Sequence, residues 1–190
     1  AATLEASGLP AEKCEVHKHM LGGGFGRRGM TDYVRQAVLI AKQMPGTPVK
    51  LLWTREEDMQ HGRYHPITQC KLSAGIDDKG QLTALHMRIS GQSILAAVFP
   101  QNVRDGKDPV VFQGLNAGGG EAMFGYSVPN LLIDHAMRNP HVPPGFWRGV
   151  NLNQNTIYVE CFLDELAHAA GQDPLAFRQK LLANSPKHLA

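Results

Sequence analysis

The sequence is organised around a glycine-rich stretch, Leu21-Gly22-Gly23-Gly24-Phe25-Gly26-Arg27-Arg28-Gly29, in which five of the last eight residues are glycine. Glycine has no Cβ, so its backbone can take positive φ and can approach another group closely. Successive free N–H groups can surround an anion, and Arg27 and Arg28 add positive charge. The stretch therefore predicts a loop that cradles a phosphate or a pterin phosphate. The alternative is a tight strand-to-helix turn with two solvated arginines.

The segments on both sides of this glycine loop show the patterns of strands and helices. Residues 14–20 alternate between two faces, which predicts a strand. Thr31 is a suitable N-cap, and apolar residues recur after it at helical spacing. Residues 49–53 predict a second strand, and the capping-box spacing of Thr54 and Glu57 predicts a short helix after it. A strand, a helix and a strand in this order predict parallel pairing through a crossover.

The pattern changes in the middle of the chain. Residues 67–76 and 82–90 alternate on either side of a turn at 77–80, which predicts an antiparallel hairpin. Residues 91–125 show no sustained period and include Ala117-Gly118-Gly119-Gly120-Glu121. We expect a long loop there, and long loops inside compact domains are often functional.

The final third is predicted to be helical after one more strand at residues 131–137. One helix carries an apolar stripe that ends before Gly171 and is formed by Ile157, Tyr158, Cys161, Phe162, Leu166, Ala169 and Ala170. Asp173 as N-cap and Pro174 as first helical residue begin a last helix, with core positions at Leu175, Phe177, Leu181 and Leu182. These patterns predict an α+β fold, a small mixed β-sheet with helices packed against it.

Composition narrows the functional classes. The chain has 190 residues, 43% hydrophobic and 19% charged, as in an ordinary globular protein. A net charge of +2 gives no reason to expect nucleic acid as a partner, and no apolar run approaches the roughly 20 residues of a membrane-spanning helix. Cys14, Cys70 and Cys161 form neither a disulfide framework nor a CxxC motif and are expected to be small buried hydrophobes. Residues 1–6 resemble the end of a helix and do not begin with methionine, so we expect an excised piece of a longer protein.

Other site classes fit the sequence less well. Residues 24–29 satisfy G-x-G-x-x-G, so a non-catalytic, Rossmann-like nucleotide-binding module is an alternative, although the acidic residue expected about 20 positions later is missing. The pairs His17 and His19, and His61 and His65, have no third ligand at a recognisable spacing, so no metal held by protein side chains is expected. A plain scaffold domain is a third possibility.

A second stretch of chemical interest is Pro143-Pro144-Gly145-Phe146-Trp147-Arg148-Gly149. The prolines stiffen the backbone, and the aromatic pair could hold the Arg148 guanidinium beside a pocket. There it would stabilise negative charge that develops in a reaction. The alternative is a surface turn whose arginine stacks on Trp147.

Several stretches, in the same order, resemble the large molybdenum-binding subunit of the xanthine dehydrogenase and aldehyde oxidase family. They are Gly22-Gly23-Gly24-Phe25-Gly26-Arg27-Arg28, Pro48-Val49-Lys50, Arg55-Glu56-Glu57-Asp58-Met59, His65-Pro66, Tyr126-Ser127-Val128-Pro129-Asn130, Phe146-Trp147-Arg148-Gly149, Gln154, Glu160 and Asp173-Pro174-Leu175-Ala176-Phe177-Arg178. The two arginines after the glycines, with Asp164-Glu165-Leu166-Ala167-His168-Ala169-Ala170-Gly171, are similar to the isoquinoline 1-oxidoreductase β-subunit branch. The resemblance runs from about residue 14 to residue 182.

The resemblance implies a molybdenum hydroxylase that oxidises an aldehyde or an N-heteroaromatic compound with water as the oxygen source. Its cofactor is molybdopterin, as the cytosine dinucleotide in bacteria, which holds the metal without protein ligands. Its electrons leave through an iron–sulfur subunit, and the sequence leaves open whether the protein is in the bacterial cytoplasm or the periplasm. Arg148 would face the substrate, and the cofactor would be bound by Gly22, Gly23, Gly24, Phe25, Gly26, Arg27, Arg28 and Gln154.

The chain departs from the family pattern in two places. Many relatives have glycine and lysine where it has Arg27 and Arg28, and Arg-Gly-Phe-Gly where it has Arg148-Gly149-Val150-Asn151, which leaves the substrate open. The family's general-base glutamate lies in a later segment, so this fragment is expected neither to turn over nor to retain the cofactor tightly. Within one cofactor-binding fragment, we expect a part at 14–92 with the glycine loop, helix and hairpin, and a part at 126–183 with the Arg148 loop and the C-terminal helices.

Overall fold

The computed structural model describes residues 1–116 and 123–189. The chain forms two compact units, each made of two segments: unit 1 contains Ala1–Tyr64 and Gly145–Arg148, and unit 2 contains His65–Pro144 and Gly149–Ala190. The glycine-rich segment noted at 117–121 lies outside the described residues. The division of the domain expected from the sequence stays a prediction.

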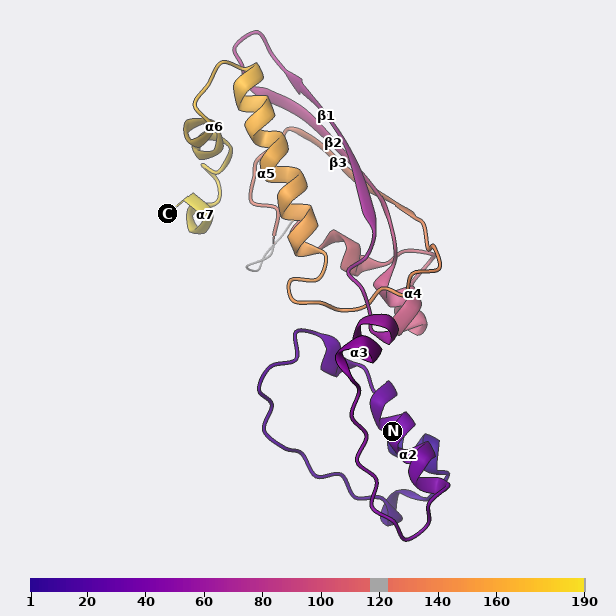
Figure 1. The fold of residues 1–190 in the computed structure, drawn as a ribbon. Coiled ribbons are helices and arrows are strands. Elements are labelled where there is room, and N and C mark those ends of the chain that lie inside the picture. The colour runs from indigo at the N-terminus through magenta and orange to yellow at the C-terminus, as the bar shows by residue number, and fades with distance from the viewer. Residues whose placement is uncertain (117–122, 190) are drawn as a thin grey trace. The chain divides into compact units, whose positions relative to one another are not determined.

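Unit 2 is built on a mixed three-stranded sheet in the order β1-β2-β3 (Figure 1). β1 (Thr68–Ile76) pairs antiparallel with β2 (Leu82–Gly91), and β3 (Asn130–Met137) lies parallel to β2. In the turn between β1 and β2, the Asp77 carboxylate accepts two backbone hydrogen bonds, at 2.9 and 2.8 Å. The predicted hairpin, the third strand and the mixed sheet are therefore confirmed.

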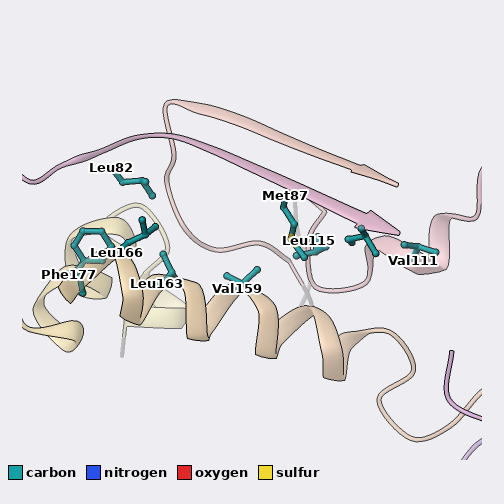
Figure 2. Close-up of a cluster of buried hydrophobic side chains, with 10 residues drawn as sticks. Leu82, Met87, Val111, Leu115, Val159, Leu163, Leu166 and Phe177 are labelled. Carbon is teal, nitrogen blue, oxygen red and sulfur yellow. The ribbon is translucent and has the colours of Figure 1, made fainter. Parts of the chain in front are cut away.

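One face of this sheet is covered by α5 (Leu152–Ala169), and the hydrophobic core lies between them (Figures 1 and 2). Leu72 of β1 is paired in register with Met87 of β2, and both belong to this core. The helix contributes Val159, Leu163, Leu166 and Ala167. Burial of this apolar surface is the main force that holds unit 2 together.

The apolar stripe predicted for α5 is confirmed only in part, since Leu166 lies in the core and Tyr158, Phe162 and Ala170 pack against it. Ile157 is 61% exposed and Cys161 is exposed, whereas Val159 and Leu163 are buried. Both sets of positions repeat at intervals of three and four residues, so helical spacing alone does not decide which one faces the sheet. Leu166 belongs to both sets and is buried.

The cysteines are less buried than the sequence predicts. Cys161 is exposed, and Cys14 and Cys70 are half-buried. Cys70 packs against the core, where burial raises the pKa of its thiol to about 11. A thiol held protonated in this way behaves as a small apolar side chain, as predicted for Cys70.

The helix predicted to start at Asp173 and Pro174 begins as expected. Asp173 caps α6 (Pro174–Leu181), because its carboxylate accepts a hydrogen bond from a backbone N–H of the first turn at 2.9 Å. Phe177 is buried in the core, but Leu175, also expected there, is 65% exposed. A last short helix, α7 (Pro186–Leu189), follows.

The segment between β2 and β3 is predicted as a long loop but contains short helical elements. They are α4 (Ile94–Val98), η3 (Pro100–Asn102) and η4 (Pro109–Phe112). The buried Asp108 carboxylate orders them by accepting hydrogen bonds from Ser93 Oγ at 2.7 Å and from a backbone N–H of α4 at 3.1 Å. Polar contacts of this kind leave no apolar period, which is why the sequence pattern misses these elements.

Unit 1 contains short helices and extended segments. They are α1 (Ala2–Ser7), η1 (Ala11–Lys13), η2 (Arg27–Gly29), α2 (Asp32–Lys42) and α3 (Arg55–His61). α2 begins after Thr31, as predicted. α3 begins after Thr54, whose hydroxyl accepts the Glu57 N–H at 3.3 Å, which confirms the predicted cap.

The strands predicted at 14–20 and 49–53 are wrong, and unit 1 has no strand among its described residues. A strand needs the hydrogen bonds of a neighbouring strand, and alternation in the sequence does not supply one. The predicted parallel crossover unit is absent from the described residues, so the Rossmann-like alternative loses its structural basis. Among residues 1–116 and 123–189, no helix has both the length and the apolar character needed to cross a membrane.

Candidate functional site

The glycine loop, residues 21–29, follows a backbone path that few side chains adopt. Gly23 and Gly26 have φ of 110° and 94°, in the left-handed region that glycine enters easily. Phe25, between them, has φ of 46°, which is uncommon for a residue with a Cβ. Its side chain is 61% exposed, so packing does not explain this conformation. Strained residues of this kind cluster at functional sites.

Gly26 is the point where this loop meets the second stretch that the sequence highlights. A Cβ on Gly26 would lie 2.6 Å from the carbonyl carbon of Phe146 and 3.1 Å from the backbone nitrogen of Trp147, so the approach requires glycine. Gly145 donates its N–H to the carbonyl of Tyr64 at 2.9 Å, which holds the start of the same segment. Unit 1 therefore brings together two stretches that are far apart in the sequence.

Arg148 lies beside the glycine loop as a result. Its guanidinium carbon is 5.4 Å from the centroid of the Phe25 ring, within the range of a cation–π contact. The strained Phe25 backbone and the docked 145–148 segment thus place a cation over an exposed aromatic ring. The role of Arg148 toward a substrate stays a prediction, and this position is compatible with it.

The backbone N–H groups of the loop fall into two sets. Those of Arg27, Gly29 and Met30 donate to carbonyls of the loop at 2.8, 3.1 and 3.2 Å. Those of residues 22–26 have no acceptor within the part of the chain that the structure describes. A Cβ on Gly22 would meet nothing within 4 Å. This side of the loop can therefore bind an anionic group against its backbone.

Arg27 anchors the loop to α2. Its Nη1 and Nη2 donate to the two carboxylate oxygens of Asp32, both at 2.8 Å, and its Cζ lies 5.9 and 5.6 Å from the ring centroids of Tyr33 and Trp53. Partial burial alone would raise the pKa of Asp32, but the hydrogen bonds and charge of Arg27 outweigh it and lower that pKa. The Nε of Arg27 is buried and has no hydrogen-bond partner among the described residues, and Arg28 is exposed. Cofactor binding by these arginines stays a prediction.

A hollow of about 340 Å³ opens against the loop. It is lined by Gly24, Phe25, Arg27, Arg55, Asp58, Gly62, Arg63, Phe146 and Trp147. Arg27 is paired with Asp32 and Arg55 with Asp58, so Arg63 adds the remaining positive charge, and the aromatic rings give the hollow apolar walls. Its size is that of a small-molecule site. The hollow therefore suits a planar ligand that carries negative charge.

Gln154 lies in unit 2, on the first turn of α5. Its Nε2 donates to Asn151 Oδ1 at 2.6 Å, and its Oε1 is buried with no partner in the part of the chain that the structure describes. Asn151 is itself buried and donates from Nδ2 to the carbonyl of Val110 at 3.0 Å. The contact of Gln154 with a cofactor stays a prediction.

Sequence reasoning misses the conformation of Val150. Its φ is 48°, which for a β-branched residue is an outlier, and Gly149 before it has φ of 86°. No propensity predicts a left-handed valine, and the one sequence signal is its departure from the family pattern directly after Arg148-Gly149. The strain makes this turn a second candidate for a functional role.

Protein side chains do not form a metal site among the described residues, where no group of three or more His, Cys, Asp and Glu could hold an ion. His17 and His61 each lie 3.5 Å from one exposed carboxylate, of Glu15 and Glu57. A metal at the glycine loop would therefore need ligands other than these side chains.

A family model described as "Molybdopterin cofactor-binding domain" matches residues 1–182. The chain belongs to this family. This molybdopterin cofactor-binding domain is 31% identical to a membrane-bound aldehyde dehydrogenase (pyrroloquinoline-quinone) of Gluconacetobacter polyoxogenes, over 95% of the chain. It is also 31% identical to isoquinoline 1-oxidoreductase subunit beta of Brevundimonas diminuta, over 96% of the chain. The chain spans 23% of the length of each of these relatives.

Two solved structures share the fold of this molybdopterin cofactor-binding domain. Quinoline 2-oxidoreductase of Pseudomonas putida 86 matches with a TM-score of 0.62 and 22% identity, over 84% of this chain and 19% of that chain. The aldehyde oxidoreductase of Desulfovibrio gigas matches with a TM-score of 0.62 and 23% identity, over 84% of this chain and 16% of that chain. The α+β fold predicted from the sequence is thus the fold of these neighbours.

The residues of the glycine loop fit the cofactor that the family name implies. A pterin phosphate is planar in one part and anionic in another. The open N–H groups of residues 22–26 and the net positive hollow offer donors and charge for the anionic part. The aromatic walls of the hollow offer surfaces for the planar part.

Proposed function

We propose that this chain is the part of a molybdenum hydroxylase that binds molybdopterin along residues 22–28 and presents Arg148 to the substrate. The parent enzyme oxidises an aldehyde or an N-heteroaromatic compound, with water as the oxygen source. The observation that carries the proposal is the docking of Gly26 against the Phe146 backbone, which puts Arg148 over Phe25 beside the open N–H groups. The names of the relatives, one an aldehyde dehydrogenase and one an isoquinoline oxidoreductase, support the substrate class.

Each part of the loop has its own task in this proposal. When bound, the molybdenum cofactor supplies the oxidation and the transfer of oxygen. The N–H groups of residues 22–26 bind the anionic part of the cofactor, and the exposed Arg28 adds positive charge. Phe25 packs against the guanidinium of Arg148 and restricts its rotation. Arg148 stabilises negative charge as it develops on the substrate, and the general base comes from another segment of the parent.

Other features of the proposed enzyme come from the family resemblance. The cofactor is the cytosine dinucleotide of molybdopterin, Gln154 supports it, and an iron–sulfur subunit takes the electrons. One relative has pyrroloquinoline-quinone in its name. Elemental analysis and pterin fluorescence of the full-length parent distinguish the two cofactors, because the proposal requires both molybdenum and a pterin.

The sharpest test compares Gly22→Ala with Gly29→Ala in the full-length parent. At either position a Cβ meets nothing within 4 Å, and neither glycine has positive φ, so both variants should fold as the wild type does. A cofactor lying against residues 22–26 would clash with the new methyl group at position 22. We expect Gly22→Ala to lower the molybdenum bound per protein by about tenfold, a loss of about 1.4 kcal/mol, and Gly29→Ala to leave it unchanged. Equal molybdenum in the two variants would refute the contact.

Two more variants separate the cofactor contact from the substrate contact. Gly26→Ala pushes away the Phe146 backbone, so we expect loss of both molybdenum and turnover. Arg148→Ala should keep the molybdenum and lower kcat by about a hundredfold, as expected when one charge-stabilising group is removed. Full turnover in Arg148→Ala would remove its proposed role. The 190-residue chain alone is expected to show no turnover and no tight cofactor retention, because the general base and further contacts lie elsewhere.

A further inference from the structure

Residues 49–53 of unit 1 have the side-chain pattern of a β-strand but no strand beside them in the described part of the chain. Between α2 and α3, the chain runs through these residues without forming a helix or a strand (Figure 1). The odd-numbered side chains of this segment are half-buried, and the even-numbered ones are exposed. Alternation with a period of two is the geometry of a strand. The segment therefore lacks only a neighbour.

The backbone of residues 49–53 is unpaired as well. None of their N–H groups donates to, and none of their carbonyls accepts from, any residue in 1–116 or 123–189. A row of unpaired N–H and C=O groups is a template for the addition of another strand. Valine and tryptophan, which stand at the two ends of this segment, are common in strands.

The helix α2 lies along one face of the segment. Leu51 and Trp53 line a hollow of about 490 Å³ together with Ala37 and Val38 of α2. Trp53 Nε1 also donates to Gln36 Oε1 on this helix at 3.0 Å. A helix packed on the face of a strand leaves its edges free, because the backbone N–H and C=O groups point sideways. A strand with a helix on one face is the usual layer of folds that combine helices with a sheet.

We propose that an extended segment of the parent polypeptide, outside these 190 residues, pairs with residues 49–53 as a neighbouring β-strand. The chain spans 23% of the length of each of the two relatives, so most of such a parent can supply the partner. Leu52 is 73% exposed, and residues 1–64 contain no buried residue, so this part of unit 1 needs an apolar cover. A segment of the same polypeptide has a higher effective concentration than a second copy of the chain. The pairing does not depend on the cofactor.

Hydrogen exchange followed by mass spectrometry tests the pairing in the full-length parent and in the 190-residue chain. The amides of residues 49–53 should exchange at least about tenfold more slowly in the parent, because a ladder hydrogen bond must open before exchange. The amides of β1 and β2 are paired within this chain and serve as the internal control. Equal exchange of residues 49–53 in the two proteins would overturn the proposal. Protection that appears in the 190-residue chain as its concentration rises would also overturn it, because the partner would then be a second copy.

Proline variants of the parent separate strand pairing from simple burial. Consecutive N–H groups of a strand point to opposite edges, so Leu51→Pro and Leu52→Pro each remove a donor from a different edge. Leu51→Ala and Leu52→Ala are the matched controls, because they shorten the side chain and keep the N–H group. At least one proline variant should speed the exchange of the other amides of residues 49–53 about tenfold more than its alanine control does. Unchanged exchange of β1 and β2 shows that the variants are folded. Proline variants that match their alanine controls at both positions would contradict the proposal.

Discussion

The interactions that stabilise unit 1 internally differ from those that stabilise unit 2. Every buried hydrophobic side chain among the described residues lies in unit 2, from Leu82 on β2 to Phe177 on α6. Residues 1–64 of unit 1 contain no buried residue at all. Their contacts are ion pairs such as Arg27 with Asp32, cation–π contacts, and the backbone docking at Gly26. The candidate site residues follow the opposite distribution, since all except Gln154 lie in unit 1.

The difference shows that the fold and the chemistry have separate sources in this chain. Unit 2 has an apolar core of its own, which supplies most of the free energy of folding. Unit 1 has a loop geometry that needs glycines, charges and one strained phenylalanine. These residues contribute little to the free energy of folding. A bound ligand stabilises the state that binds it, so we expect a cofactor to complete unit 1 where a core does not.

The largest contrast is expected when one leucine is removed from each unit. Leu163→Ala opens a cavity in the core of unit 2 and should lower the free energy of unfolding by about 2–5 kcal/mol. Leu39 on α2 is 53% exposed, and Leu39→Ala should change the same quantity by less than about 0.5 kcal/mol. Urea denaturation followed by circular dichroism measures both variants. Similar losses would show that the two units do not differ as described.

A smaller effect is expected in the polar network of unit 2. Burial and the Glu160 carboxylate raise the pKa of Tyr126 from 10.0 to about 12. The unfolded chain ionises this phenol first, so its contribution to stability is complete below pH 10 and is lost as the pH rises toward 12. Tyr126→Phe should cost about 1 kcal/mol at neutral pH and should reduce the loss of stability in this pH range.

The alkaline titration of the tyrosines checks this assignment. Near-ultraviolet absorbance of the wild type should show a tyrosine that ionises near pH 12. In Tyr126→Phe this late step should be missing. The same absorbance curve in the wild type and in Tyr126→Phe near pH 12 would contradict the predicted environment of Tyr126.

The smallest effect is expected in unit 1, at the pair of Arg27 and Asp32. The pKa of Asp32 lies below its ordinary value of 3.8, so the stabilisation is complete above that pH and is lost as the pH falls through the folded-state pKa. Asp32→Asn should lower the free energy of local unfolding of the loop by about 0.5–1 kcal/mol at neutral pH. Hydrogen exchange of residues 27–32 should speed up in this variant. Asp78→Asn, in the hairpin turn of unit 2, is the control, and an equal change there would argue against the pairing.

Sequence reasoning finds the elements whose causes are local. The cap of α6 at Asp173 and the cap of α3 at Thr54 depend on residues within one helical turn. The hairpin depends on two alternating runs joined by a short turn. The strands expected at 14–20 and 49–53 fail because pairing depends on a partner strand that these local patterns do not reveal. The stripe of α5 is only partly correct, because two sets of positions share one period.

The candidate site shows the same limit. The sequence highlights the glycine loop and the segment of Arg148, but their docking at Gly26 depends on residues far apart in the chain. The sequence predicts that Arg27 supplies a positive charge to a ligand, whereas in the structure that charge is paired with Asp32.

The segment at residues 145–148 completes unit 1 only after the intervening residues 65–144 have been synthesised. The ribosome releases the glycine loop early, and the hairpin, the loop with α4 and the third strand emerge before Phe146 can reach Gly26. Closing so long a connection carries an entropic penalty, which the sheet of unit 2 reduces once it has formed. A ligand that contacts both segments can therefore bind them together only after residue 148 has left the ribosome.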